Sequence, residues 1–127
     1  MMKKRIWIFN HYVNPGSIGV GERHIKFAEN LIVRGYDVKI FTASTLHYTG
    51  ENLINDSKKY IISKIKNADI VFIKARNYVG NGKSRVLNMI DYALGLMLVT
   101  KNFDTERPNV IYASSVHPLT WIAGYRL

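Results

Sequence analysis

Residues 5–42 read RIWIFNHYVNPGSIGVGERHIKFAENLIVRGYDVKIFT. The run at residues 5–11 is too densely apolar for a half-exposed strand and is typical of a central parallel strand. Residues 22–34 carry apolar side chains at helical spacing, and Gly35 is placed to end that helix in a left-handed conformation. Residues 37–42 again resemble a strand. A strand, a turn-rich loop, a helix and a second strand in this order predict a βαβ unit.

The same alternation continues downstream. Residues 43–57 are polar, lack periodicity and predict a long loop. Residues 69–75 predict a strand, and residues 60–65 predict either a short helix or, as we prefer, the other arm of a β-hairpin with that strand. Residues 84–101 predict a long helix, and residues 108–113 another strand. We expect the core-facing side of the long helix to comprise Val86, Leu87, Ile90, Ala93, Leu94, Met97 and Leu98. The pattern predicts an α/β protein with a Rossmann-like parallel sheet flanked by helices.

The end of the sequence predicts an incomplete domain. Pro118 suits the first turn of a final helix, and the sequence stops at Leu127 after barely two turns. A helix this short is marginal without packing partners, and a doubly wound sheet normally continues beyond it. We therefore expect residues 1–127 to form one incomplete Rossmann-like domain of a longer protein.

Composition favours anionic partners. Among the 127 residues, 18 Lys and Arg stand against 9 Asp and Glu, which gives a net charge of +9. Such an excess attracts nucleic acid, phosphorylated substrates or an acidic membrane surface, although a basic protein without a specific partner is the plain alternative. The absence of cysteine excludes disulfides, thiolate metal sites and cysteine nucleophiles.

Membrane insertion is not indicated. The apolar run at residues 6–9 is shorter than the ~7–15 residues of a signal-peptide core, and no stretch reaches the ~18 apolar residues of a spanning helix. Basic residues in the middle of the chain alternate with Tyr60, Phe72 and Tyr78. This pattern suits a nucleic-acid surface or an anionic lipid surface, but no recognisable DNA- or RNA-binding module accompanies it.

A glycine-rich loop precedes the first predicted helix. Gly16, Gly19 and Gly21 lie where free backbone N–H groups of a helix start attract phosphate. Their spacing differs from the G-x-G-x-x-G order of dinucleotide-binding proteins. The acidic residue expected about 20 positions later to hold a ribose is also absent. The loop is therefore either a ligand cradle or a plain tight turn, and a nicotinamide enzyme is disfavoured.

Two histidines follow predicted strands. His11 and His117 both come at the carboxyl end of a strand, where open α/β sheets bind ligands. A single histidine is more often structural than catalytic, but two at one sheet edge favour function. The sequence offers no carboxylate pair, no His-x-x-x-His motif, and no glycines around Ser114 and Ser115 for a nucleophile elbow. A self-sufficient hydrolase or metal site is therefore not predicted.

Several segments together resemble the opening of glycosyltransferase family 4 enzymes. They are IWIFNHY at residues 6–12, ERH at 22–24 and RGYDV at 34–38. The segment YVGNGKSRVLNM at residues 78–89 and ASSVHP at 113–118 are similar to a bacterial branch that builds capsule and O-antigen, including aminosugar transferases. The resemblance covers essentially the whole chain. One departure is Val20 between two glycines, where many relatives carry consecutive glycines.

The resemblance implies the N-terminal, acceptor-side half of a GT-B fold. Gly16, Gly19 and Gly21 would lie near the donor diphosphate, and His117 would be the catalytic histidine. The acceptor-binding residues would be His11, Tyr78, Asn81, Arg85, Asn88, Ser114 and Ser115. The nucleotide-sugar would be a co-substrate bound by the C-terminal donor domain, which this sequence lacks, and neither metal nor other cofactor is expected.

The expected function is retaining transfer of a sugar to a lipid-linked or oligosaccharide acceptor during surface-polysaccharide synthesis. We expect a cytoplasmic protein bound peripherally to the anionic inner face of the bacterial plasma membrane, without nucleic-acid partners. The chain alone would be inactive, because stabilising a departing diphosphate needs cations of the donor domain. The alternative is a free-standing basic Rossmann-like module that binds nucleotide or RNA.

Overall fold

The computed structural model describes residues 4–10, 22–45, 52–65, 68–77 and 82–113. The elements in chain order are β1 (Arg5–Phe9), α1 (Glu22–Val33), β2 (Asp37–Ala43), β3 (Tyr60–Ile65), β4 (Ala68–Ile73), α2 (Lys83–Val99), the 3-10 segment η1 (Thr100–Glu106) and β5 (Val110–Ala113). No helix within these ranges is long and apolar enough to cross a membrane.

The strands form one five-stranded sheet in the order β3-β4-β2-β1-β5. Strands β1, β2, β4 and β5 are parallel, with Ile8 paired to Ile40 on one side and to Tyr112 on the other. Strand β3 runs antiparallel to β4 at the edge. The predicted α/β class, the βαβ unit and the hairpin are therefore confirmed.

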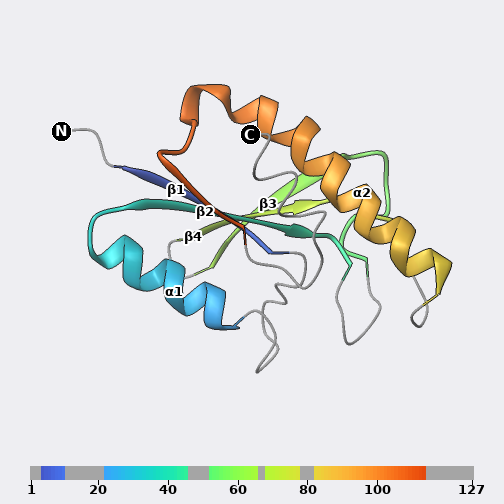
Figure 1. The fold of residues 1–127 in the computed structure, drawn as a ribbon, viewed down its shortest axis with the longest axis horizontal. Coiled ribbons are helices and arrows are strands. Elements are labelled where there is room, and N and C mark those ends of the chain that lie inside the picture. The colour runs from blue at the N-terminus through green and yellow to red at the C-terminus, as the bar shows by residue number, and fades with distance from the viewer. Residues whose placement is uncertain (1–3, 11–21, 46–51, 66–67, 78–81, 114–127) are drawn as a thin grey trace.

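The two helices cover opposite faces of the sheet (Figure 1). Ile8, Ile40 and Ile70 pack on the α1 side, whereas their neighbours Trp7 and Val71 pack on the α2 side. Because successive side chains of a strand point to opposite faces, a sheet covered on both sides needs continuous apolar strands. This explains the dense apolar runs in the sequence.

Helix α1 ends as its sequence predicts. Gly35 adopts a φ of +96°, which an L side chain rarely tolerates. Its N–H donates to Ile32 O at 2.9 Å, and the N–H of Tyr36 donates to Leu31 O at 3.1 Å. These two bonds form a Schellman motif, which satisfies carbonyls at the helix end and turns the chain into β2.

Helix α2 lies close to the sheet. A Cβ placed on Gly95 would come within 2.3 Å of Ile73 Cγ2, so glycine permits this approach. Tyr92 is fully buried, and its hydroxyl donates to Phe41 O at 2.6 Å. The buried aromatic rings of Trp7 and Phe41 pack at 5.0 Å between centroids beneath this helix.

The predicted core-facing side of α2 is wrong for four of its seven residues, whereas Ala93 is buried and Met97 packs against the core. Val86, Ile90, Leu94 and Leu98 are exposed to solvent, whereas the fully buried residues are Asn88, Tyr92, Leu96 and Val99, with Ala93 also buried at the margin. The helix is apolar on both sides, so apolar spacing alone does not identify the side that packs on the sheet. Because Asn88 and Tyr92 carry polar groups, the sequence does not mark their side of the helix as the buried one.

The remaining differences concern element ends. Strand β1 ends at Phe9 rather than residue 11, β2 extends to Ala43, and β5 begins at Val110. The helix predicted over residues 84–101 changes to a 3-10 segment at Thr100. The glycine-rich loop, residues 78–81 of the YVGNGKSRVLNM segment and the helix predicted from Pro118 lie outside the described residues.

Candidate functional site

The carboxyl edge of the parallel strands is the candidate site. From β1 the chain proceeds to β2 and β4 on one side and then places β5 on the other side of β1. Open α/β sheets bind ligands at such a switch point, outside the carboxyl ends of the strands. The residues that follow β1, β2 and β4 are polar and include Asn10, Ser44, Thr45 and Arg76.

A buried amide–imidazole pair marks the switch point. Asn10 follows β1, and its side-chain nitrogen lies 2.8 Å from Nε2 and 3.1 Å from Nδ1 of His24, in the first turn of α1. Both residues are buried. The His24 ring lies 6.5 Å from the Tyr112 ring of β5. The pair therefore links the end of β1 to the start of α1, on either side of the glycine-rich segment.

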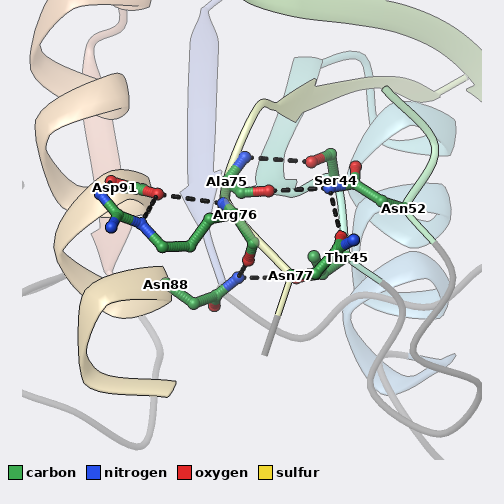
Figure 2. A network of polar contacts seen from close by, with 8 residues as sticks. All are labelled: Ser44, Thr45, Asn52, Ala75, Arg76, Asn77, Asn88 and Asp91. Atoms are coloured by element: carbon green, nitrogen blue, oxygen red, sulfur yellow. Dashed lines mark hydrogen bonds and ion pairs between the residues drawn. The ribbon is translucent and has the colours of Figure 1, made fainter. Parts of the chain in front are cut away.

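A second polar cluster joins the segments after β2 and β4 (Figure 2). The Ser44 hydroxyl accepts a hydrogen bond from Ala75 N at 3.1 Å, and Ser44 N donates to Ile73 O at 2.8 Å. The Asn52 amide donates to Ala75 O at 2.9 Å and to Asn77 Oδ1 at 2.8 Å. These bonds continue the pairing of β2 and β4 beyond the sheet and fix the course of both segments.

Asn88 connects this cluster to α2. Its side-chain nitrogen donates to Thr45 Oγ1 at 3.0 Å and to the backbone oxygen of Arg76 at 2.7 Å, and the residue is fully buried. An asparagine amide has two N–H donors, so both are engaged in holding the two segments (Figure 2). Direct contact of Asn88 with an acceptor sugar remains a prediction. Arg85 lies in the first turn of α2 and is half-buried.

Arg76 and Asp91 form a bidentate ion pair beside Asn88. Arg76 Nε lies 2.8 Å from Asp91 Oδ2, Nη2 lies 3.0 Å from Oδ1, and the backbone N–H of Arg76 donates to Oδ2 at 3.0 Å. Hydrogen bonds from the guanidinium hold the pKa of the Asp91 carboxyl below its usual range, against the opposing effect of partial burial. The same hydrogen bonds raise the pKa of Arg76. Asp91 therefore stays ionised and cannot serve as a general acid near neutral pH.

A groove of about 420 Å³ lies next to this ion pair, on the α2 side of β4. Arg76 and Asp91 contribute to its wall, Ile73 and Leu94 contribute apolar surface, and Lys59 is among its basic residues. The groove is lined by Lys59 just before β3, by the end of β4 and the segment after it, and by α2, whereas the Asn10–His24 pair lies at β1 and α1. The groove therefore offers both apolar and positively charged side chains to a ligand.

Most of the predicted site residues lie outside the described part of the chain. These are His11, Gly16, Gly19, Gly21, Tyr78, Asn81, Ser114, Ser115 and His117. By sequence, His11 follows Phe9 of β1 by two positions and Ser114 directly follows β5. Their roles remain predictions.

The described edge is rich in hydrogen-bonding side chains. Its side chains are amides, hydroxyls, an imidazole and a guanidinium, and its carboxylate is held by Arg76. Within the described ranges no three His, Cys, Asp or Glu side chains gather as metal ligands would. The surfaces built here can position a polar ligand.

Sequence reasoning missed His24, Asn10, Ser44, Arg76 and Asp91. The contacts of these residues join positions 14 to 31 apart in the sequence, so no local spacing reveals them. The signal that was available is the run Ser44-Thr45 directly after a buried strand. Polar residues at that place mark the carboxyl edge of a parallel sheet.

Comparisons with known proteins support the fold. No protein-family model matches the sequence, and no curated protein matches it. Among solved structures, the chain is similar to sucrose-phosphate synthase from Thermosynechococcus elongatus, with a TM-score of 0.61 and 13% sequence identity. The match covers 98% of this chain and 30% of that protein, so the chain spans under a third of its length. At this identity the likeness establishes the fold, an α/β domain found as part of a larger enzyme.

Proposed function

We propose that this chain forms the acceptor side of a retaining, sugar-nucleotide-dependent glycosyltransferase with a GT-B fold. The supporting observation is the parallel sheet with polar side chains at its carboxyl edge, in an arrangement similar over 98% of the chain to part of a sucrose-phosphate synthase. The family resemblance of the sequence extends this to transfer onto a lipid-linked or oligosaccharide acceptor in capsule or O-antigen synthesis.

In such an enzyme the acceptor and the donor would be bound by two different domains. The loop containing Gly16, Gly19 and Gly21 would approach the donor diphosphate, and His117 would act beside the reacting sugar. The acceptor would contact the segments after β1, β4 and β5, including His11, Tyr78, Asn81, Ser114 and Ser115, with Arg85 and Asn88 behind them. A second domain would bind the nucleotide-sugar, and neither metal nor other cofactor would be needed. The chain by itself would then transfer no sugar.

The Asn10–His24 pair has a supporting role in this proposal. It holds the chain directly before the glycine-rich loop and the helix start directly after it. Preorganised backbone N–H groups are most effective near a diphosphate when they do not have to reorganise. We therefore treat His24 as a positioning residue and His117 as the catalytic candidate.

The test uses the full-length protein with a panel of nucleotide-sugars and a lipid-linked acceptor, and it measures nucleoside-diphosphate release together with the glycan product. We expect turnover with one donor, retention of anomeric configuration, and a loss of about 100-fold or more in kcat for His117→Ala. Val33→Gln, on the exposed end of α1, serves as the matched surface control. Absence of transfer from every donor, or full activity of His117→Ala, would contradict the proposal.

The second candidate is a free-standing module that binds nucleotide or RNA, favoured by the net charge of +9. Such a module would bind oligonucleotides with an affinity that falls steeply as salt rises. Filter binding of single-stranded RNA at two salt concentrations distinguishes the two functions. Tight, salt-dependent RNA binding without sugar transfer would replace the first candidate with the second.

A further inference from the structure

Helix α2 presents an apolar side to solvent. Val86, Ile90, Leu94 and Leu98, hereafter the α2 stripe, recur every four residues and are 51%, 37%, 55% and 58% exposed. The opposite side of the same helix is buried against the sheet through Tyr92 and other core residues. Single exposed apolar residues are ordinary, but a continuous exposed row marks an interaction surface. A helix that is apolar on all sides is normally covered on all sides.

The stripe continues into the groove beside β4. Leu94 and Leu98 belong both to the stripe and to the groove lining. Lys59 and Lys74 line the same groove, and both are exposed. The apolar surface is thus wider than one helix and has positive charge along one margin.

Positive charge also stands at both ends of the stripe. Lys83 begins α2 and Lys101 follows its last residue by two positions, and both side chains are exposed. Lys83 precedes Ile90 by seven residues, about two helical turns, so the two lie on the same side of the helix. Asp91 is the one acidic residue in the α2 sequence, and it is engaged by Arg76. Apolar side chains in the middle and cations at the margins define this surface.

We propose that the α2 stripe docks the protein on the surface of an anionic lipid bilayer. The apolar side chains would enter the boundary between headgroups and acyl chains, and the surrounding lysines would contact lipid phosphates. This inference rests on the proposed function for its use, since a lipid-linked acceptor is reached at such a surface. It is tested without any sugar.

The positive charge around the α2 stripe favours an anionic bilayer over a second copy of the chain as its partner. Pairing two stripes across a twofold axis would bring Lys59, Lys74, Lys83 and Lys101 of both copies to one interface. Juxtaposed like charges oppose association, whereas an anionic bilayer offers complementary charge to the same lysines. Helix α1 covers the opposite face of the sheet, so it does not lie between the α2 stripe and a bilayer (Figure 1).

The first experiment measures co-sedimentation of the full-length protein with vesicles of phosphatidylcholine alone or mixed with phosphatidylglycerol. We expect binding to the mixed vesicles, with a partition coefficient about tenfold lower for the double variant Leu94→Gln/Leu98→Gln. Lys83→Gln should lower it about fivefold, in a salt-sensitive manner. The matched controls Val33→Gln and Arg34→Gln, exposed at the end of α1, should bind like the parent protein.

The second experiment places a probe on each face. Residues 1–127 contain no cysteine, so once any cysteine outside them is replaced by serine, Leu94→Cys and Val33→Cys can each be labelled at a single position with an environment-sensitive fluorophore. Mixed vesicles should shift the emission of the label at position 94 to the blue and leave the label at position 33 unchanged. Neither experiment requires transferase activity, so failure of the proposed function and failure of this docking surface give different results.

Three outcomes would overturn the inference. The double variant could bind mixed vesicles as well as the parent protein does. The label at position 33 could shift as much as the label at position 94. Sedimentation velocity without lipid could reveal a dimer that Leu94→Gln/Leu98→Gln dissociates, which would assign the stripe to a second copy of the chain. Circular dichroism of each variant establishes that the helix content is unchanged.

Discussion

Asn88 holds together three segments at the carboxyl edge of the sheet. Its amide reaches the hydroxyl of Thr45 after β2 and the backbone of Arg76 after β4 from its own position on α2. A buried amide with both N–H groups engaged stabilises the folded chain, because its loss leaves buried acceptors without donors. A residue predicted as part of the acceptor site thus also has a role in the architecture.

Asn88→Ala should lower the free energy of unfolding by about 2–4 kcal/mol, since one buried and one part-buried acceptor lose their donor and a small cavity forms. Urea denaturation followed by circular dichroism measures the change. Asn30→Ala, an exposed position on α1, is the matched control and should alter stability by less than about 0.5 kcal/mol. Equal effects of the two substitutions would contradict the role given to the Asn88 amide.

Asp91→Asn should destabilise the protein at neutral pH and lose its effect in acid. The pKa of Asp91 is lower in the folded protein than in the unfolded chain, so its contribution is complete above the ordinary carboxyl pKa of about 3.9. That contribution disappears as the pH falls through the folded-state pKa. Urea denaturation midpoints of the variant and the parent, measured from neutral to strongly acidic pH, give the difference in stability at each pH.

Arg76→Lys is the companion variant for that series. It keeps the positive charge but loses the planar fork that makes two parallel bonds to Asp91. Its effect at neutral pH should therefore be smaller than that of Asp91→Asn. If the difference in stability between Asp91→Asn and the parent stayed constant down to acidic pH, this result would contradict the ion-pair assignment.

Individual site residues were only partly predictable. The family resemblance of a short motif predicts Asn88 and Arg85 as acceptor-binding residues; both lie in the first turns of α2, and their contact with an acceptor stays a prediction. The Arg76–Asp91 pair was not identified, because its members are 15 residues apart and meet only after β4 and α2 pack together. Long-range polar pairing depends on tertiary geometry that local spacing does not contain.

At the scale of elements, strands were easier to predict than the orientation of a helix. The strands are apolar on both faces because α1 and α2 cover both sides of the sheet, and this density is visible in the sequence. Helix α2 is also apolar on both sides, yet only one side packs on the sheet. The side that packs on the sheet is the one with the close approach at Gly95 and the hydrogen bond from the Tyr92 hydroxyl, and hydrophobicity does not distinguish it.

Gly95→Ala tests the close packing of α2 on β4. Alanine favours helices by about 1 kcal/mol over glycine, but its Cβ would meet Cγ2 of the fully buried Ile73 at 2.3 Å. We expect a net loss of about 1–3 kcal/mol in the free energy of unfolding, as for overpacked cores. Thermal and urea denaturation measure it.

Two further variants make the Gly95 result specific. A Cβ on Gly82 would meet nothing within 4 Å, so Gly82→Ala should change stability by less than about 1 kcal/mol. Combining Gly95→Ala with Ile73→Ala should cost less than the sum of the two single changes, because the clash is relieved. Strict additivity would mean that the two positions are not in contact.

At the scale of the whole molecule, the class of fold was predictable and the strand order was not. Alternating strand and helix patterns imply a parallel sheet, and the β3–β4 arm follows from two adjacent runs with a short connection. The placement of β5 beside β1, across the sheet from β4, depends on the path of α2 and η1 over one face. That placement creates the switch point where Asn10 and His24 meet.

Tyr92 couples the stability of the whole molecule to alkaline pH. Its hydroxyl donates to Phe41 O, which also accepts the N–H of Asn10, so one buried carbonyl links α2, β2 and the end of β1. Burial raises the pKa of Tyr92 well above its usual value. Above about pH 10 the unfolded chain loses this phenolic proton while the folded chain retains it. Stability must then fall as the pH rises.

Tyr92→Phe should reverse its effect between neutral and alkaline solution. At pH near 7 the variant loses one buried hydrogen bond and should be less stable by about 1 kcal/mol. Above about pH 10 the variant has no phenol whose deprotonation in the unfolded chain favours unfolding, so its stability difference from the parent should narrow and then change sign. Urea denaturation at both pH values measures this, with the exposed Tyr112→Phe as control for general alkaline effects. A gap of the same size and sign at both pH values would mean that Tyr92 does not govern alkaline unfolding.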